Sequence, residues 1–74
     1  MKIYIITNGY IGDGLVTVLA CAKNEERALE LARKKFKEES EKYPHYGEGY
    51  YSRLEVLDEF DNLDKEWVTG VLDY

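Results

Sequence analysis

The spacing of apolar residues divides this chain into strand-like ends and a helical middle. Between residues 24 and 43 the apolar positions recur every three or four residues, which is the period of an amphipathic helix. Asn24 suits the N-cap of that helix, because its side-chain oxygen can accept a backbone N–H of the first turn. Pro44 disfavours the α conformation at Tyr43, so we expect the helix to end there. The apolar residues on the inner arc are Ala28, Leu29, Ala32, Phe36 and Tyr43.

Two-residue alternation, typical of β-strands, occurs on both sides of the predicted helix. The predicted strands span residues 2–7, 15–22, about 50–57 and 66–72. Turn dipeptides separate the first two strands and predict a hairpin with its loop near residues 9–14. The order β-β-α-β-β predicts a single α+β domain over residues 1–74, with one helix packed on one face of an antiparallel sheet. Gly70, inside the last strand, predicts a bulge or a close backbone approach.

The first strand is apolar on both of its faces. Ile3 and Ile5 point to one side of the predicted sheet, and Tyr4 and Ile6 point to the other. Because one helix covers only one face of the sheet, a partner is expected on the other face. A chain of this length buries only about 60% of its unfolded surface, so a second buried surface would also add stability. We therefore predict a homodimer.

The outer face of the predicted helix carries charges of both signs. Glu30 with Lys34 and Glu38 with Lys42 have the i,i+4 spacing and order that stabilise isolated helices. The neighbouring cations are interrupted by glutamates, which favours a solvated face over a basic binding stripe. Those cations are Arg33, Lys34, Lys35 and Lys37.

The formal net charge of −5 comes from the C-terminal half, because the N-terminal half is slightly positive. Residues 1–43 contain eight Lys or Arg and seven Asp or Glu, whereas residues 44–74 contain two and eight. Nucleic acid binding needs Lys and Arg to displace counterions from the phosphates, so the acidic half disfavours nucleic acid as a partner. It favours a basic protein partner, or simply solubility.

Cys21 is the only cysteine, so the chain cannot form an internal disulfide. This fits a reducing compartment, and the position of Cys21 late in an apolar strand predicts a buried, inert thiol. The N-terminal apolar run ends at Asn8 and is far shorter than a signal peptide or a membrane-spanning segment. We therefore expect a soluble, cytoplasmic protein that does not contact a membrane.

Three features superficially resemble functional sites, and each has a simpler interpretation. The glycines of residues 9–14 lack the G-x-G-x-x-G spacing and precede a strand, which favours a hairpin loop over a phosphate loop. The acids of residues 58–64 lack the glycine and the terminal glutamate of a calcium loop. His45 is the only histidine, and a nucleophilic pair with Cys21 would require the two residues to meet beside an orienting group. We predict no catalytic residue, no cofactor and no metal site.

The segment from residue 43 to residue 51 is rich in tyrosine. Tyrosine is enriched at interface hot spots, because it buries a large area at low entropic cost and keeps a polar tip. With the acids that follow, the tyrosines predict a surface for a protein partner. Ordinary packing and stacking on a nucleobase are the alternatives. The predicted partner-binding residues are Tyr43, Tyr46, Tyr50, Tyr51, Asp58, Glu59, Asp61 and Asp64.

Three short motifs resemble those of an uncharacterised family of small bacterial and phage proteins. They are the opening strand at residues 2–6, the Glu-Glu-Arg-Ala sequence at residues 25–28, and the Leu-Asp-x-x-Trp-x-x-Gly segment at residues 63–70. The tyrosine-rich residues 43–51 are not part of the family pattern. The resemblance implies a β-β-α-β-β fold and an accessory protein of a phage or mobile element, a class that includes small inhibitors of host defence.

These observations predict a small acidic protein-interaction module that is not an enzyme. The alternative is a homo-oligomer that binds a small nucleotide, with tyrosines and Arg53 or helix lysines around the phosphate. An enzyme would have to rest on Cys21, His45 and the acids, and no catalytic constellation supports it.

Overall fold

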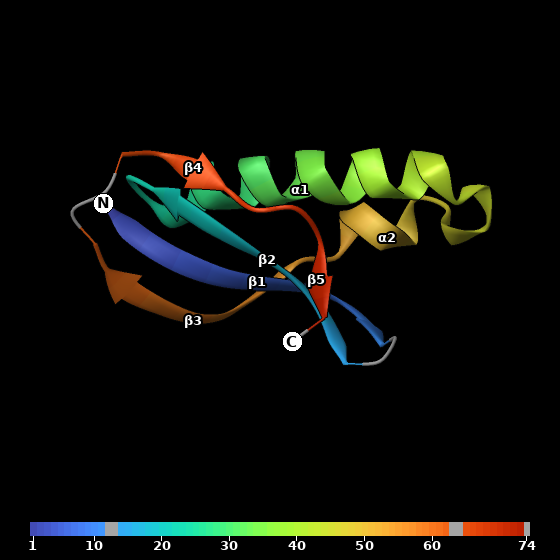
Figure 1. The fold of residues 1–74 in the computed structure, drawn as a ribbon, viewed down its shortest axis with the longest axis horizontal. Coiled ribbons are helices and arrows are strands. Elements are labelled where there is room, and N and C mark those ends of the chain that lie inside the picture. The colour runs from blue at the N-terminus through green and yellow to red at the C-terminus, as the bar shows by residue number, and fades with distance from the viewer. Residues whose placement is uncertain (12–13, 63–64, 74) are drawn as a thin grey trace.

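The structure, a computed structural model, describes residues 1–11, 14–62 and 65–73. It confirms the predicted α+β class and the β-β-α-β-β order, with two short helical turns added between α1 and β3 (Figure 1). The elements are β1 (Lys2–Ile11), β2 (Leu15–Ala22), α1 (Glu25–Lys42), the 3-10 turn η1 (Pro44–Tyr46), α2 (Gly49–Ser52), β3 (Glu55–Asp61), β4 (Trp67–Val68) and β5 (Leu72–Asp73).

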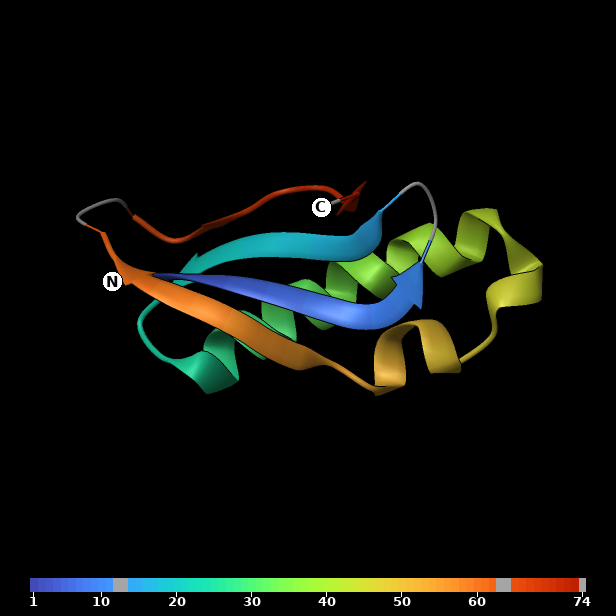
Figure 2. The same ribbon diagram turned by 90° about the horizontal axis from the view of Figure 1, so that it is seen from below.

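The strands form one antiparallel sheet in the order β3-β1-β2-β4, and β5 also pairs with β2. Figure 2 views the sheet from the side opposite α1, which lies behind the strands. Among the described elements, no helix covers the face turned toward the viewer in Figure 2. β3 has a single neighbour, β1, and therefore forms one edge of the sheet.

The hydrophobic core lies between the sheet and α1. Its buried side chains come from both central strands, from the inner arc of the helix and from α2. They are Tyr4, Ile6, Val16, Val18, Ala20, Ala22, Ala28, Ala32, Phe36 and Tyr50. Leu29 is half-buried beside this core, and Tyr43 is 45% exposed although the helical period placed it on the inner arc. The backbone of Tyr43 has left the helical conformation (φ −131°, ψ 82°), so the period no longer directs its side chain.

The ends of α1 are those that the sequence predicts. Asn24 is the N-cap, and its side chain accepts a hydrogen bond of 2.8 Å from the Arg27 N–H. The helix ends at Lys42, directly before Tyr43 and Pro44. The predicted i,i+4 ion pairs are wrong: Glu30, Glu38 and Lys42 pair instead with residues at i,i+3. These pairs are Arg27–Glu30, Lys35–Glu38 and Glu39–Lys42.

The first predicted strand is too short, because β1 continues from Thr7 to Ile11. The pairing of β1 with β2 shifts register between these two residues. Gly9 lies in this interval with φ +83°, a conformation that side chains other than glycine rarely adopt. The Gly9 N–H donates to the Thr7 hydroxyl at 3.0 Å. The turn dipeptide Asn8-Gly9 thus marks an irregularity inside the hairpin rather than the start of its loop.

The third predicted strand is wrong over residues 50–52, which form part of α2. The strand itself begins at Glu55 and runs to Asp61, beyond the predicted end near residue 57. Tyr50 explains the shift, because its side chain is 3% exposed and its ring meets Phe36 edge-on at 5.9 Å. The Asn8 side chain also donates to the Tyr50 carbonyl at 2.8 Å. Packing of Tyr50 in the core therefore overrides the alternation of the sequence.

The fourth predicted strand is divided into β4 and β5, which both pair with β2. Thr69 causes the break, because its hydroxyl accepts the Leu19 N–H at 3.0 Å while its own N–H donates to the Leu19 carbonyl at 2.9 Å. A side-chain oxygen thus replaces a backbone acceptor of the ladder. Gly70 follows this interruption, and no heavy atom beyond its chain neighbours lies within 4 Å of where its Cβ would be. Gly70 therefore marks an irregularity in the strand and no close backbone approach.

Candidate interaction surfaces

The predicted tyrosines lie around the C-terminal end of α1, and the structure adds Tyr10 to them. The rings of Tyr46 and Tyr50 stack at 4.3 Å with an interplanar angle of 4°. Tyr10 meets Tyr50 edge-on at 4.8 Å, and its hydroxyl donates to the Tyr46 carbonyl at 3.2 Å. Sequence reasoning missed Tyr10 because it assigned this residue to the hairpin loop. Its position next to a turn signal gave no indication of contact with residues 46–50.

The four predicted tyrosines differ in exposure. Tyr50 is buried and Tyr46 is half-buried, so both act mainly in packing. Tyr43 is 45% exposed. Tyr51 is half-buried, and the Lys37 ammonium lies 5.9 Å from the centre of its ring. Only part of the tyrosine cluster therefore offers a surface to a partner.

The predicted acids lie on β3, with the exception of Asp64, which is outside the described residues. Asp58, Glu59 and Asp61 are exposed. Glu59 forms an ion pair of 3.8 Å with Lys2, and one carboxylate oxygen of Asp58 accepts the Glu59 N–H at 2.8 Å. Within the described ranges, Asp58 and Asp61 form no ion pair. β3 therefore presents carboxylates that are largely uncompensated.

Two large apolar side chains lie among these acids. Phe60 is 48% exposed and pairs with Ile3, which places it on the sheet face opposite α1. Leu57 is 41% exposed and lies at a register shift, since Ile5 pairs with Asp58 while Ile6 pairs with Val56. We call the exposed residues of β3 the acidic edge; they are Glu55, Leu57, Asp58, Glu59, Phe60 and Asp61.

The structure separates the acidic edge from most of the tyrosines. β1 begins beside Asp61, at the end of the sheet where β2 leads into α1. The tyrosines follow the other end of α1, an 18-residue helix that is about 27 Å long. Figure 1 shows the same arrangement, with the end of β3 next to the N-terminus and α2 beneath the far part of α1. The seven predicted residues that the structure describes therefore do not form one surface.

Cys21 and His45 are separated by the same helix. Cys21 lies near the end of β2 and is fully buried, whereas His45 is exposed in η1 beyond the C-terminus of α1. The His45 ring lies 4.5 Å from the ring of Tyr46. This arrangement gives no nucleophilic pair. Within the described ranges, no group of three or more His, Cys, Asp or Glu side chains could hold a metal ion.

Most side chains on the sheet face opposite α1 are buried or half-buried, although α1 covers the other face. Ile5 is 6% exposed, and Thr17 and Cys21 are fully buried. Phe60 and Leu72 remain 48% and 44% exposed at its borders. The unpartnered apolar surface is thus smaller than the two-faced pattern of the first strand predicts. No helix in the described parts of the chain has the length and apolar composition needed to cross a membrane.

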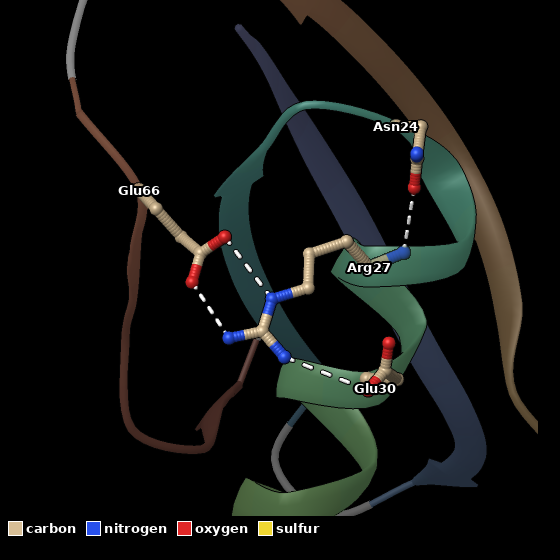
Figure 3. Close-up of polar contacts among 4 residues, drawn as sticks. All are labelled: Asn24, Arg27, Glu30 and Glu66. Atoms are coloured by element: carbon tan, nitrogen blue, oxygen red, sulfur yellow. Dashed lines mark hydrogen bonds and ion pairs between the residues drawn. The ribbon is translucent and has the colours of Figure 1, made fainter.

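Arg27 ties the C-terminal segment to the start of α1 (Figure 3). Its guanidinium donates two hydrogen bonds to the Glu66 carboxylate, at 2.8 and 3.1 Å, and lies 3.5 Å from Glu30. The hydrogen bond and the charge of Glu66 raise the pKa of Arg27. The hydrogen bond from Arg27 in turn lowers the pKa of Glu66. This bidentate pair holds the residues before β4 against the helix, and the sequence spacing gave no sign of it.

Open grooves lie beside α2 in the part of the chain that the structure describes. The larger, of about 700 Å³, runs between residues 7–10 of β1 and residues 48–55. The N–H groups of Gly9 and Tyr10 are already bonded to the side chains of Thr7 and Asn8, so they offer no free donors to a ligand there. The smaller groove, of about 390 Å³, is lined by Glu30, Arg33, Lys34, Lys37 and Tyr51.

Comparison with protein-family models, with curated proteins and with solved structures gave no match to this chain. The resemblance to small bacterial and phage proteins stays a prediction. A functional assignment must therefore rest on the surfaces of the chain itself.

Proposed function

We propose that this chain is a non-enzymatic protein-interaction module that binds a basic segment of another protein along the acidic edge. The observation that carries this proposal is the composition of β3, which combines largely uncompensated carboxylates with two exposed apolar side chains on an edge strand. Acting as an inhibitor, as the resemblance implies, the module would occupy a basic surface of its target.

The position of β3 favours binding by strand addition. An edge strand has backbone N–H and C=O groups on its open side, and an extended segment of a partner can pair with them. Leu57 and Phe60 supply the apolar contacts that a row of charges cannot supply. The affinity would then come from backbone pairing and apolar burial, while the carboxylates select the partner.

The charges of β3 also disfavour a second copy of this chain at the same edge. In an antiparallel pair of two β3 strands centred on Asp58, Asp58 lies opposite Asp58 of the second copy, and Glu55 lies opposite Asp61 of the second copy. Like charges directly opposite each other destabilise a strand pair. A basic partner strand places opposite charges across from these carboxylates and is attracted to them. β3 therefore favours a basic strand over a second copy of itself.

A matched pair of variants tests the proposal. The double substitution Asp58→Lys and Asp61→Lys reverses two charges on the acidic edge, and Glu26→Lys with Glu41→Lys makes the same change on the exposed side of α1. Tagged wild type and both variants are used to capture proteins from a lysate, and the captured proteins are quantified by mass spectrometry. Circular dichroism checks that both variants are folded.

We expect a set of basic proteins that wild type and the helix variant capture and the edge variant loses. The capture should also weaken with increasing salt, since the attraction is between exposed charges. An edge variant that retains every specific partner contradicts the proposal. Tyr43→Ala tests the tyrosine end separately, and we expect no loss of partners from it.

Self-association is a separate proposal that rests on the face opposite α1. If the predicted homodimer forms, Phe60 and Leu72 are the exposed apolar residues available for its contact. Light scattering gives the solution mass, and Leu72→Lys should convert a dimer of this kind to a monomer. A monomeric wild type at about 100 μM would leave the acidic edge as the only proposed interface.

A further inference from the structure

The smaller groove concentrates positive charge in a chain whose net charge is −5. It lies between α1 and α2. Figure 1 shows α2 beneath the second half of α1. Arg33, Lys34 and Lys37 line it from α1, and Tyr51 lines it from α2. We call these four residues and Glu30 the helix groove.

The three cations of the helix groove are not neutralised by neighbours. The ion pairs of the described part of α1 use Arg27, Lys35 and Lys42, and none involves Arg33, Lys34 or Lys37. Glu30 is the only acid of the groove, and it already pairs with Arg27 at 3.5 Å. The lining of the groove therefore has three cations without an ion pair and one carboxylate that is already paired, which favours an anionic ligand.

The spacing of the cations suits a ligand with several adjacent anionic groups. Residues three and four apart on a helix lie about 5–6 Å from one another at their Cβ atoms, so Lys37 is close to both Arg33 and Lys34. A guanidinium can bind phosphate oxygens in a bidentate manner, and the two ammonium groups act as mobile point charges. Together they match a chain of phosphates better than a single carboxylate.

The Tyr51 ring lines the helix groove beside the three cations. Its neighbour Tyr50 is buried in the core and fixes α2, whereas the Tyr51 ring remains half-buried at the groove. The Lys37 ammonium lies 5.9 Å from the ring centre. A bound phosphate would attract this ammonium and leave the face of the ring free to stack on a flat aromatic group. Base stacking on an aromatic side chain contributes to binding in a way that tolerates different bases.

We propose that the helix groove binds a nucleoside polyphosphate, with the phosphates on Arg33, Lys34 and Lys37 and the base on Tyr51. This site is independent of the acidic edge, so either proposal can fail without the other. It requires only one copy of the chain, because all of its lining residues belong to two neighbouring helices of the same chain.

Titration calorimetry tests the site with ATP, GTP, adenosine, inorganic tripolyphosphate and an oligoglutamate peptide as probes. The variant Lys34→Gln with Lys37→Gln removes two cations of the groove. The control, Lys35→Gln with Lys42→Gln, removes two cations of the same helix that are paired with Glu38 and Glu39. Tyr51→Leu removes the ring and keeps an apolar side chain.

We expect wild type to bind ATP and GTP more tightly than tripolyphosphate and to bind adenosine weakly. The groove variant should lose at least about tenfold in affinity for ATP, because two charge-assisted contacts disappear, while the control changes less than about twofold. Tyr51→Leu should bring the affinity for ATP down to that for tripolyphosphate and leave the latter unchanged.

Three results would overturn the proposal. The first is the absence of ATP binding by wild type at millimolar concentration. The second is an equal loss of affinity in the groove and control variants, which would indicate a general charge effect. The third is tighter binding of an oligoglutamate peptide than of either nucleotide, which would assign the groove to an acidic protein segment.

Discussion

Asn8 connects the hairpin to α2, and its replacement by alanine should destabilise the fold more than its place in a turn dipeptide indicates. The side chain is 5% exposed and makes two hydrogen bonds. It donates to the Tyr50 carbonyl at 2.8 Å and accepts the Tyr10 N–H at 3.0 Å. Alanine leaves both backbone groups without these partners in a part-buried region.

The magnitude follows from the two groups left unpaired. Each costs about 1–3 kcal/mol, so we expect Asn8→Ala to lower the free energy of unfolding by about 2–6 kcal/mol. A chain of 74 residues has a total stability of about 4–11 kcal/mol, so this is a large fraction. With a slope of about 1 kcal/mol per M, the urea midpoint should fall by about 2 M or more.

Asn24→Ala provides the matched control. It removes an asparagine that makes one exposed hydrogen bond, to the Arg27 N–H, and a lost N-cap costs about 1 kcal/mol. Urea unfolding of both variants, followed by circular dichroism, gives the comparison, and hydrogen exchange at the Tyr10 amide reports the local effect. A cost for Asn8→Ala no larger than that for Asn24→Ala would refute the structural role of Asn8.

Three further changes test other parts of the fold. Phe36→Ala empties a fully buried position and should lower the free energy of unfolding by about 3–5 kcal/mol, measured by denaturant unfolding; a cost below about 1 kcal/mol would contradict the core assignment. Gly9→Ala forces a side chain to φ +83° and should cost about 1–2 kcal/mol, whereas Gly70→Ala, at an open position without positive φ, should cost less. Since the pKa of Glu66 is lowered in the folded state, its contribution to stability is present above its ordinary pKa of 4.5 and is lost as pH falls through the folded value. Unfolding measured between pH 6 and pH 3 should therefore show a smaller acid-induced loss in Glu66→Gln than in wild type, and identical profiles would rule out the pair with Arg27.

Local signals in the sequence were sufficient for the main elements of the fold. The helix was predictable because Asn24 and Pro44 act on backbone groups next to them, and its inner arc because Ala28, Ala32 and Phe36 repeat at the helical period. The first strand of the hairpin was predictable from its β-branched residues and tyrosine. Residues 50–54 were not, because the burial of Tyr50 against Phe36 is a tertiary contact that competes with alternation.

The candidate surfaces were less predictable than the fold. Tyr43 and Asp61 are close enough in sequence to suggest one surface. They lie apart because β3 carries the chain back along the sheet before it reaches Asp61. The acids were identified correctly as exposed, but their place on an edge strand depends on the pairing of β3 with β1, which periodicity alone does not give. The convergence of Lys37 and Tyr51 depends on the packing of α2 and was likewise out of reach.

The central position of β1 also has a consequence for folding kinetics. β1 pairs on one side with β2, a neighbour in sequence, and on the other with β3, where Lys2 lies opposite Asp61. Closing this second pairing orders a much longer loop, so the hairpin and α1 should form first and β3 should dock after them. By the same reasoning, β3 should exchange its amide protons through local opening before β2 does. β3, the strand that we assign to partner binding, therefore opens locally, and a bound partner can suppress this opening.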